Sequence, residues 1–292
     1  TEAGKFASFF QEGELETIQK LTVSGPLDAS DIDTIRYQMP KLEVLDMKEV
    51  ELIESDKTYG AEDHREHYKL KKGVITKKML QCFSLLVTLV LPKDITEIED
   101  YGIYGNEKLV SVEIPVTVKK VGANAFKSCS SLQKVDLPSV ETLGASVFER
   151  CGKLTTVTLS SGLQAIPDNA FRDCGSLVDV PLPPSLVSIG TGAFEQCRSL
   201  TSVNMPNTVT TLNNSAYYVC TNLKEVKLSE NLKNIGDASF CECGNLISID
   251  IPASVSTINS HAFRSCVKLE TVTLHEGLQS IEGASFSGCK SL

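Results

Sequence analysis

The sequence predicts an α/β solenoid, a right-handed coil with a parallel strand sheet on its concave face and short turns and helical pieces on its convex face. The first observation is a sequence motif that recurs along the chain, as in AFKSCSSLQKVDLP from residue 125 and AFRDCGSLVDVPLP from residue 170. The second is its constant period, because a repeat of 20 to 50 residues is typical of solenoids whose units stack only on their neighbours. One cysteine column shows this period, spaced 22 residues apart once and 23 thereafter: Cys129, Cys151, Cys174, Cys197, Cys220, Cys243, Cys266 and Cys289.

Each unit reads C-x-x-L-x-x-V-x-L-P-x-x-V-x-x-I-G-x-x-A-F, and its parts predict the sides of one coil. The alternation of Val135 and Leu137 before Pro138 indicates a short strand, which pairs in parallel with the same strand of the next coil. Apolar residues three apart, such as Leu186 and Ile189, follow on the return side of the coil. The Ala-Phe pair then closes the turn.

The aromatic residue of that pair recurs in register, so we expect one buried column of rings rather than a cofactor site. Its members are Phe126, Phe148, Phe171, Phe194, Tyr217, Phe240, Phe263 and Phe286, and Ile103 and Leu80 continue it upstream.

The cysteine column predicts free, buried thiols in a tight turn, where a small side chain packs against apolar neighbours and offers a weak S–H donor. Asn106 occupies the same position one unit earlier, which supports a role in bonding the turn. Ten cysteines also allow a disulfide framework, but side chains in register on adjacent coils point the same way and do not converge on an S–S bond. Zinc is disfavoured because ligands at this pitch form a line, not a tetrahedron.

The consensus of the repeat, L-x-x-V-x-L-P-x-x-V-x-x-I-G-x-x-A-F-x-x-C, resembles the BspA-type leucine-rich repeats, also called the Treponema pallidum class, over residues 74 to 292. Thr117, Gly162 and Ser185 stand where ordinary leucine-rich repeats place the asparagine of their ladder, which supports this subclass. The resemblance implies a surface or secreted protein of a host-associated bacterium, with a role in adhesion to host matrix proteins and other cells.

One continuous solenoid domain is expected, in three parts. Residues 1 to 50 form an N-terminal capping region with degenerate repeats, which holds an amphipathic helix in residues 1 to 17 and a second helix that starts at Asp28 or Ser30 and ends near Met39. Residues 51 to 73 are an insert loop. Residues 74 to 292 are tandem 23-residue leucine-rich repeats whose last coil is incomplete, so we expect the natural chain to continue or this end to pack on another molecule.

The insert is rich in charge and carries two histidines. His64 and His67, with Glu62 and Asp63, are types of residue that bind metal ions, but the H-E-x-x-H pattern of zinc enzymes is missing. We therefore interpret the insert as a solvated loop and predict no metal site.

The sequence favours no catalytic or cofactor chemistry. It shows no nucleophile beside a base, no paired buried carboxylates and no phosphate-binding glycine loop, so we predict a protein that is not an enzyme. The net charge of −9 disfavours nucleic acid as a partner. No apolar run reaches the roughly 18 residues of a membrane span, and the oligomeric state stays open.

A protein partner, such as host extracellular matrix or another cell surface, is predicted to bind the outward side chains of the strands. That row is polar and without aromatic residues, and the chain has no tryptophan to stack on a sugar, so a glycan-binding module or a structural spacer of a larger surface protein is the alternative. The candidate contact residues are Asp46, Glu113, Asp136, Thr158, Asn204, Lys227 and Asp250. The same row contains Pro181, where the sheet should lose a ladder bond because proline has no N–H.

Overall fold

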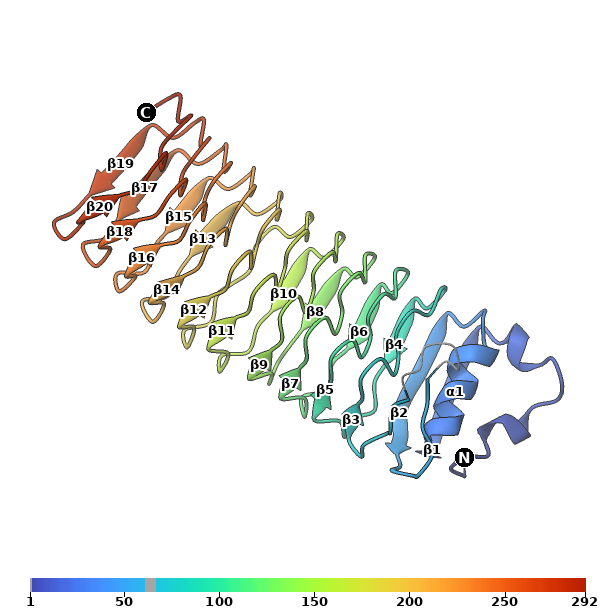
Figure 1. The fold of residues 1–292 in the computed structure, drawn as a ribbon. Coiled ribbons are helices and arrows are strands. Elements are labelled where there is room, and N and C mark those ends of the chain that lie inside the picture. Colours follow the sequence, from blue (N-terminus) through green and yellow to red (C-terminus); the bar gives the residue numbers. More distant parts are fainter. Residues whose placement is uncertain (1, 61–66) are drawn as a thin grey trace.

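The predicted solenoid of parallel strands is confirmed. The computed structural model describes residues 2–60 and 67–292, which form one elongated stack of coils with α1 at the N-terminal end (Figure 1). Every strand pair between coils is parallel and joins equivalent positions of successive repeats, as in Val135 with Val157 and Ile189 with Leu212. The register thus follows the repeat period.

One side of the stack carries the predicted Val-x-Leu strands, and we call this side the strand face. Its outward side chains are exposed and its inward ones are buried, as in β8, where Lys134 and Asp136 are exposed around buried Val135. The strands of this face are β1 (Lys20–Leu27), β2 (Val44–Leu52), β4 (Thr88–Val90), β6 (Ser111–Glu113), β8 (Lys134–Asp136), β10 (Thr156–Thr158), β13 (Ser202–Asn204), β15 (Glu225–Lys227), β17 (Ser248–Ile251) and β19 (Thr271–Leu274).

The strand-face sheet is interrupted at the coil of Pro181, as predicted. Six strands join in the order β1-β2-β4-β6-β8-β10, and the next strand on this face is β13, which pairs with β15 in a separate ladder. Between them a single bridge joins Thr156 to Asp179. Proline cannot donate to a ladder, which accounts for the break at Pro181. A further break separates β15 from β17, although neither strand contains a proline.

The return side differs from the expected helical pieces, because it carries two-residue strands in two further parallel sheets. Leu186 closes a turn by donating its N–H to Pro183 O, and Ile189 lies in the strand that follows. The three-residue apolar spacing therefore spans a turn and a strand, not one helical turn. These strands are β3 (Val74–Ile75), β5 (Glu97–Ile98), β7 (Lys120–Val121), β9 (Thr142–Leu143), β11 (Ala165–Ile166), β12 (Ser188–Ile189), β14 (Thr211–Leu212), β16 (Asn234–Ile235), β18 (Thr257–Ile258) and β20 (Ser280–Ile281).

The aromatic column is confirmed as a core element. Rings from Phe126 to Phe286 stack face to face on their neighbours in the next coil, with centroids 5.1–5.6 Å apart and interplanar angles of 3–16°. The turn that holds each ring needs left-handed backbone at two positions per coil, for example at Asn124 (φ 57°) and Ser128 (φ 63°). The short side chains at most of these positions tolerate that region better than large branched ones.

Tyr217 is the one tyrosine of this column, and its hydroxyl is buried without a hydrogen-bond partner among the described residues. Burial also raises its pKa far above the usual range, so the phenol stays neutral. We expect Tyr217→Phe to raise the free energy of unfolding by about 1 kcal/mol, because the change removes an unsatisfied buried polar group and keeps the ring. Urea denaturation followed by circular dichroism measures this, with Tyr104→Phe as the control, because Tyr104 is half-buried and its hydroxyl makes no hydrogen bond in the described residues. A loss of stability would mean that the hydroxyl has a partner, such as a buried water.

The N-terminal cap contains the predicted second helix, but the expected helix in residues 1 to 17 is wrong. Asp28, one of the two residues at which the sequence placed the helix start, is the N-cap of α1 (Ala29–Gln38). The first segment instead forms two 3₁₀ turns, η1 (Phe6–Phe9) and η2 (Leu15–Thr17). Gly13 between them has a φ of +82°, which no α-helix contains.

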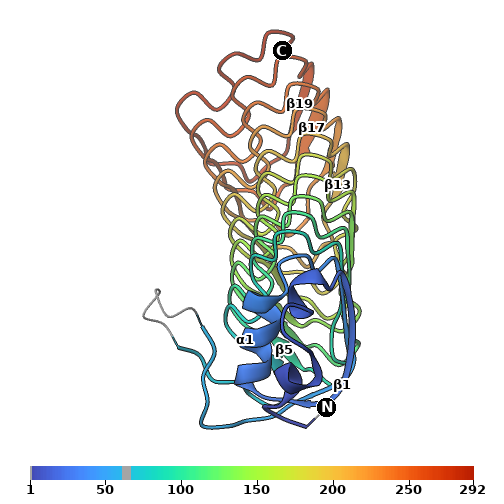
Figure 2. The same cartoon turned by 90° about the vertical axis from the view of Figure 1, so that its right-hand side faces the viewer.

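Residues 53–60 and 67–73, between β2 and β3, leave the stack as two arms of an excursion. Tyr59 and Tyr68 exchange two N–H to O bonds of 2.9 Å across its base. The buried Tyr59 hydroxyl donates to Lys77 O at 2.7 Å and so fixes the base to the next coil. Figure 2 shows that the excursion projects on the side opposite the strand face. His64, Glu62 and Asp63 of the metal hypothesis lie outside the described residues.

Candidate binding surface on the strand face

The structure places the candidate contact residues on the strand face in three groups. Asp46 lies beside Val90, which lies beside Glu113, in β2, β4 and β6. Asp136 lies beside Thr158. Beyond the interrupted coil, Asn204 lies beside Lys227, and Asp250 follows in β17. The row is therefore divided twice, at the coil of Pro181 and between β15 and β17, which belong to separate ladders.

Three of the candidate carboxylates are engaged within the chain, those of Asp46, Asp136 and Asp250, the last of them with His275. Asp46 accepts a hydrogen bond from the backbone N–H of Lys48 at 2.9 Å. Asp136 lies 2.9 Å from the Lys134 ammonium and accepts a 2.7 Å bond from the Thr158 hydroxyl. The hydrogen bond from Lys134 and then that from Thr158 lower the pKa of Asp136, so its charge persists at neutral pH. Asp46 and Asp136 thus have local roles that the sequence did not indicate.

Lys227 and Asp250 line a hollow of 410 Å³ at the carboxyl ends of β15 and β17. Its wall includes His275, whose Nε2 lies 2.8 Å from the Asp250 carboxylate. Leu228 and Pro252 give the hollow an apolar part. His275 was not singled out from the sequence, although its position just after the strand residue Leu274 was a usable signal.

Glu113 lines a second hollow, of 230 Å³, at the carboxyl ends of β4 and β6. Pro115 and Val116 form its apolar part, and Val116 is 68% exposed. Both hollows lie where a strand ends and the recurrent Leu-Pro or Ile-Pro turn begins. The strand face therefore offers polar side chains at its centre and small mixed hollows along one edge.

The cysteine column has a structural role. Each thiol from Cys129 to Cys289 donates to a backbone carbonyl of the aromatic column one coil earlier, as Cys151 does to Phe126 O, and Cys129 donates to Ile103 O at the upstream end of that column. The S to O distances are 3.1–3.4 Å. Burial raises the pKa of Cys129 to about 12 and raises those of the other column thiols, so they stay protonated donors. Asn106 makes the equivalent bonds through its amide. All ten cysteines are free, including the eight of the column to which the in-register argument applied.

The described residues contain no group of three or more histidine, cysteine or acidic side chains that could hold a metal ion. Among the helices of residues 2–60 and 67–292, none combines the length and hydropathy that a membrane span requires. The arrangement on the strand face is suited to contacts through charge, hydrogen bonds and small apolar surfaces.

Known proteins share this architecture. The solved pneumococcal vaccine antigen PcpA is similar at 20% identity, over 82% of this chain and 69% of that chain, with a TM-score of 0.52. The Treponema pallidum leucine-rich repeat protein is 24% identical over 81% of this chain and 87% of its own, with a TM-score of 0.42. A leucine-rich cell surface protein from Faecalibacterium prausnitzii is 22% identical over 82% and 85% of the two chains, with a TM-score of 0.39. No curated protein matches the chain significantly.

The family comparison covers most of the chain. The BspA type leucine rich repeat region, in six copies, matches residues 74–200 and 164–292. These ranges hold the cysteine ladder, the whole aromatic column and all the strands from β3 onward. The chain therefore belongs to the BspA-type leucine-rich repeat family.

Proposed function

We propose that this chain is a non-enzymatic binding module of a cell-surface or secreted protein, and that its strand face contacts a protein partner such as host extracellular matrix or another cell surface. The observation that carries this proposal is the row of outward strand residues, which the parallel register holds in line along the solenoid. Solenoids bind partners by presenting side chains of many coils on one extended surface. Family membership supports the same class of function.

The side chains of Glu113, Asn204 and Lys227 are the best candidates for direct contact. Each is exposed, and no hydrogen bond or ion pair engages any of the three side chains within residues 2–60 and 67–292. Glu113 and Lys227 also line the two hollows at the edge of the sheet. A partner can therefore pair with these groups without first breaking contacts inside the chain.

Surface plasmon resonance against a panel of extracellular matrix proteins, with a glycan array in parallel, tests the proposal. We expect Glu113→Lys and Lys227→Glu each to change the association rate with a bound matrix protein by about tenfold at low salt, and less at high salt. Glu107→Lys and Lys233→Glu are matched controls, since both side chains are exposed and lie off the strand face. If only the controls alter binding, the strand face is not the contact surface. Binding on the glycan array alone would favour the glycan-binding alternative.

A further inference from the structure

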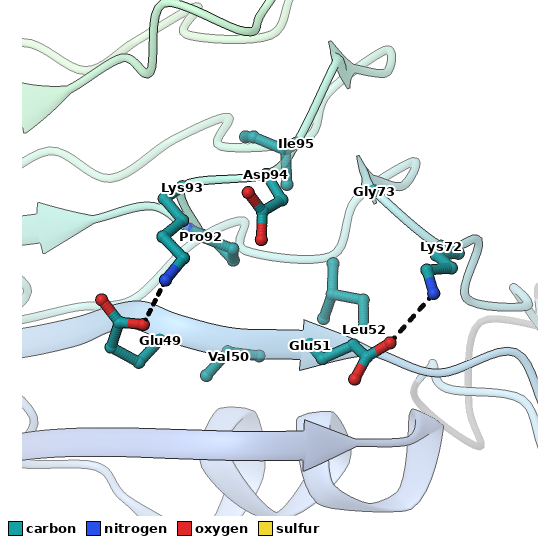
Figure 3. A pocket seen from close by; sticks show the side chains of 10 residues that line it. All are labelled: Glu49, Val50, Glu51, Leu52, Lys72, Gly73, Pro92, Lys93, Asp94 and Ile95. Atoms are coloured by element: carbon teal, nitrogen blue, oxygen red, sulfur yellow. Dashed lines mark hydrogen bonds and ion pairs between the residues drawn. The ribbon is translucent and has the colours of Figure 1, made fainter.

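A groove of 510 Å³ lies beside the second half of β2, apart from the row of candidate contact residues. One wall is Glu49–Leu52 of β2, the other is the turn from Pro92 to Ile95, and Lys72 and Gly73 close one end (Figure 3). The groove exists because β2 is nine residues long while its neighbour β4 has three. The two coils therefore diverge after β4 ends.

This divergence leaves one edge of β2 without a strand partner. β1 pairs with β2 through Leu27 and Leu52, whereas β4 pairs with β2 only from Val44 to Asp46. The last backbone bond between β2 and the coil of β4 runs from Lys93 N–H to Lys48 O, at 3.2 Å. Beyond that bond, the β2 edge faces the groove.

The backbone groups that face the groove are those of Val50 and Leu52. Ile53 donates its N–H to Leu27 O on the β1 side, and successive residues of a strand direct their backbone groups to opposite edges. Val50 and Leu52 therefore present N–H and C=O to the groove. No described residue on that side hydrogen-bonds to them.

A bulge in β2 produces this orientation. The pairing with β1 shifts between Thr22 and Ser24, so that two residues of β2, Met47 and Lys48, stand opposite one residue of β1. The Asp46 carboxylate stabilises the bulge by accepting the Lys48 N–H. Bulges redirect a strand locally, and an exposed strand edge is a template for a further strand.

We propose that this groove binds an extended peptide segment of a protein partner, which adds to β2 as a strand. The free donors and acceptors of Val50 and Leu52 have the spacing that an extended backbone matches. Residues 49–52 would pair with a segment of about four residues at roughly 3.3 Å each. Ile95 and Pro92, with the buried side chains of Val50 and Leu52, give the groove an apolar part that accepts a small aliphatic side chain.

The charges at the rim favour a basic residue in that segment. Glu49 pairs with Lys93 at 2.5 Å and Glu51 pairs with Lys72 at 3.0 Å, so two ion pairs tie the walls together. Asp94 has no ion-pair partner in the described part of the chain, and Figure 3 shows its side chain directed from the turn toward β2. Three carboxylates and two ammonium groups leave one negative charge uncompensated at the groove. A lysine or arginine beside the aliphatic residue complements it.

Selection from a displayed library of random heptapeptides against the whole chain, followed by fluorescence anisotropy of the enriched peptides, tests this site. We expect enriched sequences that alternate aliphatic and polar residues and include a basic one. Asp94→Lys should weaken their binding by about tenfold, and so should N-methylation of the peptide at the residues that donate to β2. Glu107→Lys should leave the affinity unchanged. Amide exchange at Val50 and Leu52, measured by nuclear magnetic resonance, should slow when peptide binds.

The groove shares Lys93 with the hollow beside Glu113, but Lys227 lies in β15, many coils away. Lys227→Glu should therefore leave peptide binding intact, which separates this test from that of the strand-face function. The proposal is overturned if no peptide is enriched, or if enriched peptides bind Asp94→Lys and wild type equally. Protection of Val50 and Leu52 that depends on protein concentration without peptide would assign the edge to a second copy of the chain instead.

Discussion

Phe194→Ala is expected to lower the free energy of unfolding by about 3–5 kcal/mol, the usual cost of deleting a buried phenylalanine ring. Phe194 is 1% exposed and stacks between Phe171 at 5.3 Å and Tyr217 at 5.1 Å. Its removal therefore leaves a cavity and breaks two ring contacts. Denaturant unfolding followed by circular dichroism measures the loss.

Phe9→Ala is the matched control for this change, because Phe9 is 63% exposed and its loss should cost little. In a stack that is stable only through neighbouring coils, a break in the column should also separate the unfolding of the two halves. A loss of less than about 1 kcal/mol in Phe194→Ala would contradict a column that holds the coils together.

Asp31→Ala is expected to release the N-terminal cap from the solenoid and to lower stability by about 3 kcal/mol. The Asp31 carboxylate is buried and accepts backbone N–H bonds from Gly4 at 2.7 Å, Phe6 at 2.9 Å and Asp28 at 2.9 Å. Alanine leaves these donors without a partner, and a buried unsatisfied donor costs more than the bond itself contributes.

Limited proteolysis measures release of the cap, since residues 2 to 17 should be cleaved much faster in Asp31→Ala than in wild type. Glu12→Ala is the control, because Glu12 is exposed and no hydrogen bond to its side chain is present in the described residues. Equal cleavage of the two variants would show that other contacts hold the cap, such as packing of buried Phe6.

The parts of the fold that depend on the repeat were predictable from the sequence. The period fixes which residues stack between coils, so the ring column at Phe126 to Phe286 and the thiol ladder at Cys129 to Cys289 follow from position alone. Pro181 was equally predictable, because an imino nitrogen cannot donate wherever the strand lies.

Features that depend on a departure from the repeat were not predictable. The bulge of β2 and the groove beside it result from the length of β2 against that of β4, which no local pattern indicates. Lys71 pairs with Glu99, just after β5 on the return side, and Lys72 pairs with Glu51 near the end of β2, and neither contact follows from the repeat.

The strand face itself was predictable, but the use of each side chain on it was not. Alternation along a strand establishes that Asp46, Glu113 and Asp136 point outward. Alternation does not show that the Asp46 carboxylate accepts the Lys48 N–H in the bulge of β2, or that Asp136 pairs with Lys134. These contacts depend on side-chain rotamers and on neighbouring coils. Glu113 and Lys227 are left as the charged groups open to a partner.

The most direct test of strand-face binding is covalent labelling of lysine and carboxylate side chains, read by mass spectrometry, with and without a bound matrix protein. We predict that the partner shields Glu113, Lys227 and Asp250, and that it leaves the labelling of Glu107, Glu141 and Lys233 unchanged. All six side chains are exposed in the free chain. Shielding of Glu141 and Lys233 without shielding of Glu113 and Lys227 would contradict the account and assign binding to the return side.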